Sequence, residues 1–513
     1  MSRRIAIASM IWGGSILLSR LIGLVREAVI GRVLGGGASA DVYFTAFTLP
    51  DFFHYLLAGG ALSIVFIPIF NGYLERGEED RAWEAFSVTA NFILLLLAVL
   101  LPALWVAAPR LVPLVAPGFD AAQQADLVRL TRIMLPAQAF HLVGGLLSAV
   151  LQARDRHLIP ALAPLCYTAA VIAGGLIGGP AAGGYGFAWG VLVGSAIGPF
   201  ALPLAGCLRQ RFDWRPILRL NHPDLKTYLV RSIPIMIAWS IVAVDDWILR
   251  RLGSLIGSGA VSTLQYGKQL MYVPMGVFGL ATGVAAFPTL TRLIARGEGS
   301  QAYTTLAGAV RRMLVLAFAA QVVLTGAGRG ISMLVYGGRI APEQHAAIGV
   351  ALACFSLGLW AWAAQTVVAR GFYALGNTWV PSILGTAVVP LAYPLYVWAG
   401  GRWGPTGLAC VSSLAVTVYV VSLILLLRRR FPGAADGYVP FFARLVPATA
   451  AGIGAGLFAA DRLAGAHPYL SAGAAALAGL VVFTAAAAAL GTPEIREAAD
   501  WLRRRGRPAA SPR

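Results

Sequence analysis

The chain has 513 residues, of which 58% are apolar and only 12% are charged, about half the charged share of a typical soluble protein. The mean hydropathy is +0.74. A soluble protein of this length could not cover its surface with so few charges. The composition therefore excludes a cytosolic enzyme or a secreted domain and indicates an all-α polytopic membrane protein.

The charge is strongly basic, with 40 Lys and Arg against 22 Asp and Glu and a net charge of +18. In a soluble protein this balance would suggest nucleic acid, but in a membrane protein it is typical of cytoplasmic loops. We therefore expect no nucleic-acid partner. The cysteines lie in apolar runs without metal-ligand spacing, which predicts small core residues and no metal site: Cys166, Cys207, Cys354 and Cys410.

A transmembrane helix needs about 20 mostly apolar residues, and fourteen segments of the chain meet this description. The first begins like a signal peptide, but it continues to about Val33 without a cleavage site, so we interpret it as a span. The ninth span is short as drawn, and we expect it to extend back through Arg311. The predicted spans are 5–33, 42–70, 86–108, 133–152, 160–177, 188–207, 229–249, 261–290, 313–325, 347–369, 381–398, 406–426, 445–460 and 470–490.

Lys and Arg are distributed unevenly between the two sets of alternating segments. One set, which includes both termini, carries 26 of them, and the opposite set carries 9. Because basic residues favour the cytoplasmic side, this asymmetry predicts that both termini are cytoplasmic.

An internal repeat appears when the sequence is shifted by about 220 residues. Arg76-Gly77-Glu78 falls on Arg296-Gly297-Glu298 and Pro68 falls on Pro288, while one residue later in phase Pro160 falls on Pro381. Each copy holds six spans, so both copies insert the same way up. The repeat predicts two parallel six-helix lobes followed by two further helices, a design typical of transporters that work by alternating access.

The predicted domains follow from this repeat. They are an N-lobe at 1–217, a C-lobe at 222–430, two extra C-terminal spans at 431–491 and a basic cytoplasmic tail at 492–513.

Ionisable residues inside a span are rare and usually face a cavity or a partner. In the first span, Arg20 and Glu27 share a helical face, and Arg26 lies about 100° around the helix. The second span carries Asp41 and His54, the seventh carries Asp245 and Asp246, and the eighth carries Lys268.

Two interpretations of these charges stay open at this point. They could form internal salt bridges, Arg26 with Asp41 and Glu27 with Arg20, and His54 could be a core histidine. Alternatively, they could line a positive, water-filled cavity for an anionic phosphate or pyrophosphate, because arginine binds phosphate oxygens bidentately and lysine adds a point charge. Residues near span ends are expected to reach water: Arg32, Arg231, Arg250 and Asp51.

The chain resembles the MurJ/MviN family of lipid II flippases, which belongs to the multidrug/oligosaccharidyl-lipid/polysaccharide exporter (MOP) superfamily. The likeness rests on Ser19-Arg20-Leu21-Ile22-Gly23-Leu24-Val25-Arg26-Glu27, followed by Asp41, Leu49-Pro50 and Phe66-Ile67-Pro68. Further matches cover nearly the whole chain: Arg154 to Pro164, Tyr266, Leu270, Pro274, Gly371-Phe372-Tyr373, Pro381 and Gly407-Leu408-Ala409.

The resemblance implies a transporter, not an enzyme, that flips undecaprenyl-diphosphate-linked peptidoglycan precursor (lipid II) from the inner to the outer leaflet of the bacterial plasma membrane. It implies a cationic cavity that grips the pyrophosphate, with Arg20, Arg26 and Asp41 at essential family positions, and a groove for the polyprenyl tail. It also implies a role in cell-wall biogenesis, with other cell-wall synthesis proteins as candidate partners.

The sequence departs from the family at several cavity positions. His54 stands where one arginine is expected, and Gln269 replaces a second, with Lys268 one position earlier. Asp246 matches the acid of a cation site that some members have, so it is a candidate cation ligand. Pro390 and Pro394 occupy the matching eleventh-span positions, which argues against a sodium site of that form.

Two alternatives follow from these departures. The chain could export another polyprenyl-linked oligosaccharide, for capsule, O-antigen or exopolysaccharide. A membrane transferase would need clustered acids or a large outer loop, and the only acidic pair in a span is Asp245-Asp246. We expect no cofactor, and coupling to the membrane potential or to an ion of unknown identity.

Overall fold

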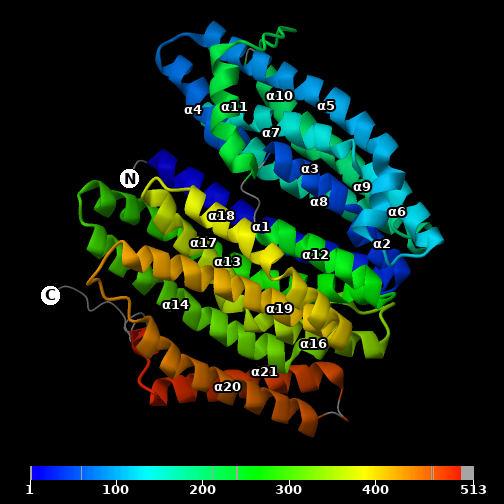
Figure 1. Ribbon diagram of the computed structural model, residues 1–513, viewed down its shortest axis with the longest axis vertical. Coiled ribbons are helices and arrows are strands. Elements are labelled where there is room, and N and C mark those ends of the chain that lie inside the picture. The colour runs from blue at the N-terminus through cyan, green and yellow to red at the C-terminus, as the bar shows by residue number, and fades with distance from the viewer. Residues whose placement is uncertain are drawn as a thin grey trace, which may run out of the picture. The chain divides into compact units, whose positions relative to one another are not determined.

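The chain is helical throughout the part that the structure describes. The computed structural model describes residues 3–58, 61–210, 212–237, 241–463, 465 and 467–497, and no strand occurs in any of them. Long helices account for most of these residues, as Figure 1 shows. The predicted all-α fold class is therefore confirmed.

The helices pack into two compact units, which are described separately. Unit 1 comprises Met1–Ser262 and Tyr336–Ala341, and unit 2 comprises Thr263–Val335 and Pro342–Arg513. Residues 222–262, which the repeat assigns to the C-lobe, pack with unit 1. Packing and sequence repetition thus divide the chain differently, and the lobe boundaries stay a prediction.

Unit 1 is built from twelve α-helices in its described residues and two short helices of other types. They are α1 (Arg3–Leu34), α2 (Ala38–Ala46), α3 (Thr48–Ala58), α4 (Ala61–Glu75), α5 (Glu79–Val115), α6 (Ala121–Met134), α7 (Ala137–Ala153), α8 (Leu158–Gly178), η1 (Pro180–Ala182), α9 (Tyr185–Ser195), η2 (Ala196–Ala201), α10 (Leu202–Leu208), α11 (Pro223–Ile237) and α12 (Ile241–Ile256).

Unit 2 begins at Thr263, the fourth residue of α13. Its helices are α13 (Ala260–Ala295), α14 (Gly299–Gly326), α15 (Gly328–Tyr336), α16 (Pro342–Leu357), α17 (Leu359–Ala374), α18 (Trp379–Leu391), α19 (Tyr393–Arg429), α20 (Tyr438–Arg462) and α21 (Pro468–Ala489). The ninth predicted span lies in α14, which extends back through Arg311 as expected. Gly404 interrupts α19 with a φ of 59°.

Each of the fourteen predicted spans is helical over most of its described residues, and the helices are interrupted for one or two residues at Phe47, Leu135–Pro136, Gly358 and Ala392. By length and apolarity, eight helices of the described residues are able to cross a membrane, and the bent pair α16 and α17 raises this number to nine. The chain is thus a multi-pass membrane protein. The number fourteen stays a prediction.

The core of unit 1 contains a cluster of aromatic rings at one end of α4 and α5. Phe66 and Phe70 of α4 contact Trp83 and Phe86 of α5, and Phe212 closes the cluster, with ring centroids 5.4–6.2 Å apart. Such edge-to-face contacts add specificity to apolar burial. The cluster holds the segment that follows α10 against the bundle.

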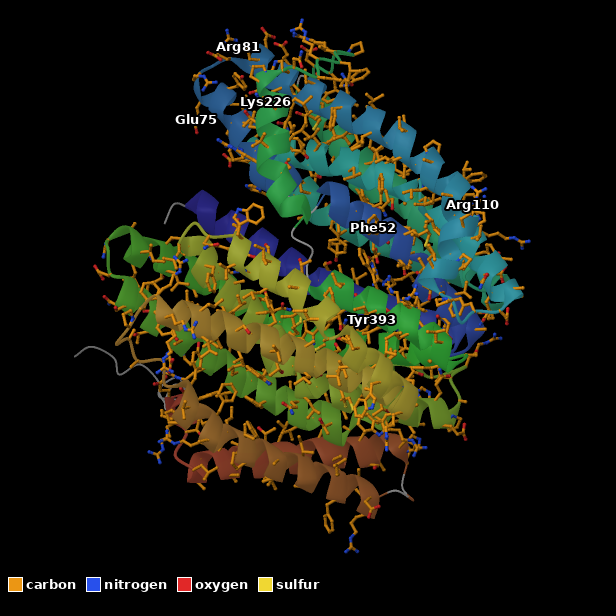
Figure 2. The ribbon with its side chains drawn as sticks, in the orientation of Figure 1. Phe52, Glu75, Arg81, Arg110, Lys226 and Tyr393 are labelled. Carbon is orange, nitrogen blue, oxygen red and sulfur yellow. The ribbon has the colours of Figure 1, made fainter. Side chains whose placement is uncertain are left out.

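Charged side chains mark the two ends of unit 1. Glu75, Arg81 and Lys226 gather at one end of the unit, Arg110 lies at the other, and Phe52 lies between them (Figure 2). The first three residues belong to segments that the basic-residue count predicts as cytoplasmic, and Arg110 belongs to the opposite set. Unit 1 therefore has its charged loops at two ends, separated by apolar helices.

Glycines let helices approach closely within each unit. In unit 1, a Cβ on Gly190 of α9 would lie 2.7 Å from the carbonyl oxygen of Ala170 in α8. In unit 2, a Cβ on Gly452 of α20 would lie 2.9 Å from the carbonyl oxygen of Gly479 in α21. Any larger residue at either position would push the backbones apart, as expected for small-residue packing in membranes.

The repeated Arg-Gly-Glu segments fold into the same turn in both units. Gly77 and Gly297 have φ values of 73° and 78°. Each donates its N–H to the carbonyl three residues earlier at 3.0 Å, and the N–H of Glu78 and of Glu298 reaches the carbonyl five residues earlier, also at 3.0 Å. These are the bonds of a Schellman-type helix end, in which glycine adopts the left-handed conformation without a steric penalty.

A second turn repeats with a different residue at its left-handed position. Asp155 follows α7 with a φ of 58°, and Gly376 follows α17 with a φ of 72°. Both turns place an N–H on the carbonyl three residues earlier at 3.0 Å. The local structure thus supports the sequence repeat, since two pairs of turns match bond for bond.

Candidate functional site

Arg26 of the first span forms an ion pair with Glu27, the next residue in the sequence. The guanidinium of Arg26 on α1 donates from Nη2 and Nε to Oε1 of Glu27, at 2.6 and 3.2 Å. Glu27 is 5% exposed, and its Oε2 is buried without a donor among the described residues. The pair therefore has an unused acceptor on the carboxylate, and the guanidinium keeps N–H groups for a further anion.

Two tyrosines lie around this pair. Tyr43 of α2 and Tyr167 of α8 are within electrostatic reach of both Arg26 and Glu27. The helices pack accordingly, since α1 lies against α8 and also contacts α2. The side chain of Arg20 lies outside the described residues, so its predicted role stays a prediction.

The carboxylate of Asp41 holds a turn and not a cation. Its two oxygens accept the N–H groups of Gly259 and Ser262, at 2.6 and 2.7 Å. The Ser262 hydroxyl in turn donates to the carbonyl of Gly36 at 2.8 Å. Asp41 thus satisfies backbone donors that the first turn of a helix leaves free. The salt bridge of Arg26 with Asp41, one of the two interpretations left open, is not the contact in the structure, where Arg26 bonds Glu27 and Asp41 bonds backbone N–H groups.

His54 belongs to a polar cluster, which we call the histidine cluster: His54, Gln138, His141, Tyr167 and Ser195. The rings of His54 on α3 and His141 on α7 lie 6.1 Å apart between centroids, nearly perpendicular. Ser195 Oγ of α9 lies 2.9 Å from His141 Nε2, and the Tyr167 ring lies 5.4 Å from the His141 ring. Four helices of unit 1 therefore bring polar groups together inside the bundle.

Sequence reasoning found His54 but missed the rest of the histidine cluster. His141 lies within the predicted span 133–152, so the rule that ionisable residues in spans are functional candidates would have found it. Tyr167 and Ser195 carry no comparable signal, because hydroxyl groups are common in transmembrane helices.

A second buried ion pair lies near the start of α3. Arg250 of α12 is 7% exposed, and its Nη1 lies 3.2 Å from Asp51 Oδ2 and 3.4 Å from the Thr48 hydroxyl. The expectation that Arg250 and Asp51 reach water is wrong for Arg250, because its side chain is buried and forms an ion pair with Asp51 within unit 1.

Asp246, the candidate cation ligand, lies on α12 within electrostatic reach of Asp51. Asp246 is partly buried, and its neighbour Asp245 is 1% exposed. Among the described residues, no group of three His, Cys, Asp or Glu side chains has the spacing to hold a metal ion. A cation here would need backbone or hydroxyl oxygens as further ligands.

In unit 2, the buried lysine of α13 lies against aromatic rings. Lys268 is 1% exposed, and its Nζ lies 5.6 Å from the ring centroid of Tyr272 and 5.1 Å from that of Trp362 on α17. Both distances are in the range of cation–π interactions, which stabilise an ammonium without neutralising it. Gln269, the next residue, is partly buried.

Each unit thus has a buried cation among its described polar groups. Unit 1 has an arginine with free donor capacity beside a buried carboxylate, and unit 2 has an ammonium held by rings.

Comparison with known proteins decides the family. The family model described as "Lipid II flippase MurJ" matches residues 30–471. The chain belongs to the lipid II flippase MurJ family. A curated relative named lipid II flippase MurJ, from Burkholderia cenocepacia, is 29% identical over 452 residues, which cover 85% of this chain and 86% of the relative.

Solved structures agree on the fold. The chain is similar to a structure titled lipid II flippase MurJ in an inward closed conformation, with a TM-score of 0.77, 19% identity, and coverage of 93% of this chain and 98% of the other. It is also similar to an inward-facing multidrug resistance MATE family transporter of the MOP superfamily, with a TM-score of 0.66, 14% identity, and coverage of 81% and 98%. The family and its relatives make the chain a transporter and not an enzyme.

Proposed function

We propose that this chain flips lipid II from the inner to the outer leaflet by alternating access. Membership of the MurJ family supports this proposal, and the observation that carries it is the Arg26 guanidinium within the helix bundle, whose hydrogen bonds among the described residues use two of its N–H groups, both on Glu27. The lipid II headgroup is too polar to cross roughly 30 Å of hydrocarbon unaided. A protein that moves it must replace the water around its pyrophosphate.

The pyrophosphate is the group that the buried cations suit. The Arg26 side chain is 27% exposed while Glu27 is almost fully enclosed, so the guanidinium is the accessible member of the pair. Arginine presents a planar fork of donors that matches phosphate oxygens. We propose that the pyrophosphate contacts Arg20, Arg26 and His54 of the first lobe, with Glu27 holding the Arg26 fork in place.

The second lobe contributes a point charge. We propose that Lys268 and Gln269 contribute to the grip on the pyrophosphate, since the Lys268 ammonium is buried and lies at cation–π distance from the rings of Tyr272 and Trp362. Switching from inward to outward then weakens the grip by separating the cations of the two lobes. Release needs this step, since an anion held equally in both states would not be delivered.

We further propose where the protein works. The excess of Lys and Arg on one set of loops supports insertion in the bacterial plasma membrane with both termini cytoplasmic. Other cell-wall synthesis proteins are candidate partners, because the flipped precursor must be handed on. Transport is coupled to the membrane potential or to an ion.

The departures at His54 and Gln269 favour a second candidate, an exporter of another polyprenyl-linked oligosaccharide. Competition binding separates the two. The purified chain in nanodiscs is titrated with fluorescent lipid II, and unlabelled lipid II is compared as a competitor with an undecaprenyl-diphosphate oligosaccharide without peptide. We expect lipid II to compete at least tenfold better, about 1.4 kcal/mol. Equal competition, or a preference for the other lipid, would favour the second candidate.

A further inference from the structure

The histidine cluster has the composition of a proton-binding site. Histidine is the side chain whose unperturbed titration lies closest to neutral pH, and two of the six histidines of the chain contact each other inside unit 1. We propose that His54 and His141 together bind one proton, and that this proton is the coupling ion of the transporter. The binding itself stands on the geometry of unit 1, and only its coupling role rests on the proposed function.

The hydrogen bonds of Ser195 decide the state of one nitrogen of His141. The Ser195 hydroxyl has a single hydrogen and lies 2.6 Å from the carbonyl of Val191, a bond that it donates. Its oxygen must then accept from His141 Nε2 at 2.9 Å. His141 therefore carries hydrogen on Nε2, which leaves Nδ1 as the nitrogen that takes up or releases a proton.

Gln138 supplies the acceptor that a protonated His54 needs. The Gln138 side chain is within hydrogen-bonding reach of His54, is 8% exposed, and its Oε1 is buried without a donor among the described residues. An imidazolium has two N–H donors where a neutral ring has one. Protonation of His54 adds a second N–H, so the ring can donate to this oxygen and keep a further donor.

The pair accepts one proton and not two. The ring centroids are 6.1 Å apart, so two imidazolium charges in a membrane interior would repel each other strongly. Titration of one ring must therefore depend on the other, and the proton belongs to the pair.

The remaining charged groups around the cluster are mostly engaged with one another. Asp51 on the same helix as His54 bonds Arg250 of α12, and Arg26 bonds Glu27 beyond Tyr167. Within the cluster, Tyr167 of α8 is within electrostatic reach of these charged groups, Asp51, Arg26 and Glu27.

The charge of this proton can act on the proposed substrate site through the Arg26–Glu27 pair. Tyr167 contacts the His141 ring and is within electrostatic reach of Arg26 and Glu27. A positive charge on the histidines therefore acts through one side chain on the guanidinium proposed to hold the pyrophosphate. Proton uptake and release would tune the anion grip in step with the transport cycle.

Histidine NMR on the full chain tests the inference. The protein is labelled with ¹³C-histidine and titrated in nanodiscs, and signals are assigned with His→Asn variants. We expect His54 and His141 to show linked curves with one proton shared, and His54→Asn to shift the His141 midpoint by about one pH unit, a tenfold change in proton affinity. The matched control His467→Asn, an exposed residue on the connection before α21, should leave the His141 curve unchanged.

A second variant guards against misfolding of His54→Asn. Gln138→Leu removes the orphan acceptor and should lower the proton affinity of His54 by about threefold, with the other histidine signals unchanged. An unchanged His141 curve in a folded His54→Asn protein, or independent curves for the two rings, would overturn the proton site. Loss of lipid II binding with linked curves intact would instead contradict the proposed function.

Discussion

The two units stabilise a cation inside the membrane by different means. Unit 1 sets carboxylates against its arginines, Arg26 with Glu27 and Arg250 with Asp51. In unit 2, the aromatic rings of Tyr272 and Trp362 lie over the ammonium of Lys268. A carboxylate cancels the charge that it stabilises, whereas a ring leaves the charge in place. Carboxylates and aromatic rings thus both accompany buried cations in the described residues.

The largest expected effect comes from breaking the ion pair of α1. Arg26→Ala leaves the carboxylate of Glu27 buried without its donor, which should destabilise the protein by about 3 kcal/mol. Thermal unfolding in detergent measures this loss. The exposed Arg81→Ala, which removes a surface pair with Glu78, is the matched control and should change stability by about 0.5 kcal/mol or less. Equal stability of the two variants would show that Glu27 does not depend on Arg26.

The ring contacts of unit 2 should appear as an energetic coupling. In a double-mutant cycle of Lys268→Met and Trp362→Leu, we expect a coupling of about 2 kcal/mol, because the ammonium is desolvated over the ring. The quantity compared is the free energy of unfolding of the four proteins. Strict additivity would mean that the ring does not stabilise the ammonium.

Asp41 offers a carboxylate that acts on backbone and not on a cation. Asp41→Asn keeps one acceptor oxygen and loses one of two charge-assisted bonds, so we expect a destabilisation of about 1 to 2 kcal/mol. Hydrogen exchange of the Gly259 and Ser262 amides locates the effect, and these amides should exchange faster in the variant. Unchanged exchange at both amides would contradict the role in capping.

The smallest effects should come from the second pair of repeated turns. Gly376→Ala introduces a Cβ at a φ of 72° and should destabilise the protein by about 1 kcal/mol. Asp155→Gly relieves a left-handed side chain at a φ of 58°, but it also loosens the unfolded chain, so we expect stability within about 0.5 kcal/mol of the parent. A loss of stability in Asp155→Gly as large as that in Gly376→Ala would show that glycine is not favoured at the position of Asp155. The two turns would then not be equivalent.

Much of the fold was predictable because membrane solvent restricts the chain. The bilayer core holds no water to bond the backbone, and a helix satisfies its backbone hydrogen bonds within one segment. Apolar runs of about 20 residues therefore predict helices, and the predicted spans are mostly helical. The repeat of Arg-Gly-Glu was predictable for a similar reason: glycine in a left-handed turn leaves a clear mark in the sequence. The two packing units were not predictable from the repeat, because residues 222–262 belong to the second copy of the repeat but pack with unit 1.

The candidate site was predictable in its residues more than in its contacts. Arg26, His54 and Lys268 stand out because charge inside a span is rare. Their partners do not follow from spacing: Arg26 bonds its sequence neighbour, and Lys268 finds a tryptophan that lies 94 residues later in the chain. Helix periodicity gives the face of a residue, but tertiary packing decides which side chain that face meets.

The central claim is that this chain transports lipid II through a grip on the pyrophosphate by buried cations of the first lobe. The most direct measurement is complementation of a bacterium whose own lipid II flippase is shut off. The account predicts growth with the native chain and with Arg81→Ala, and no growth with Arg20→Ala or Arg26→Ala at equal membrane expression. Growth with both cavity variants, or no growth with the well-expressed native chain, would contradict it.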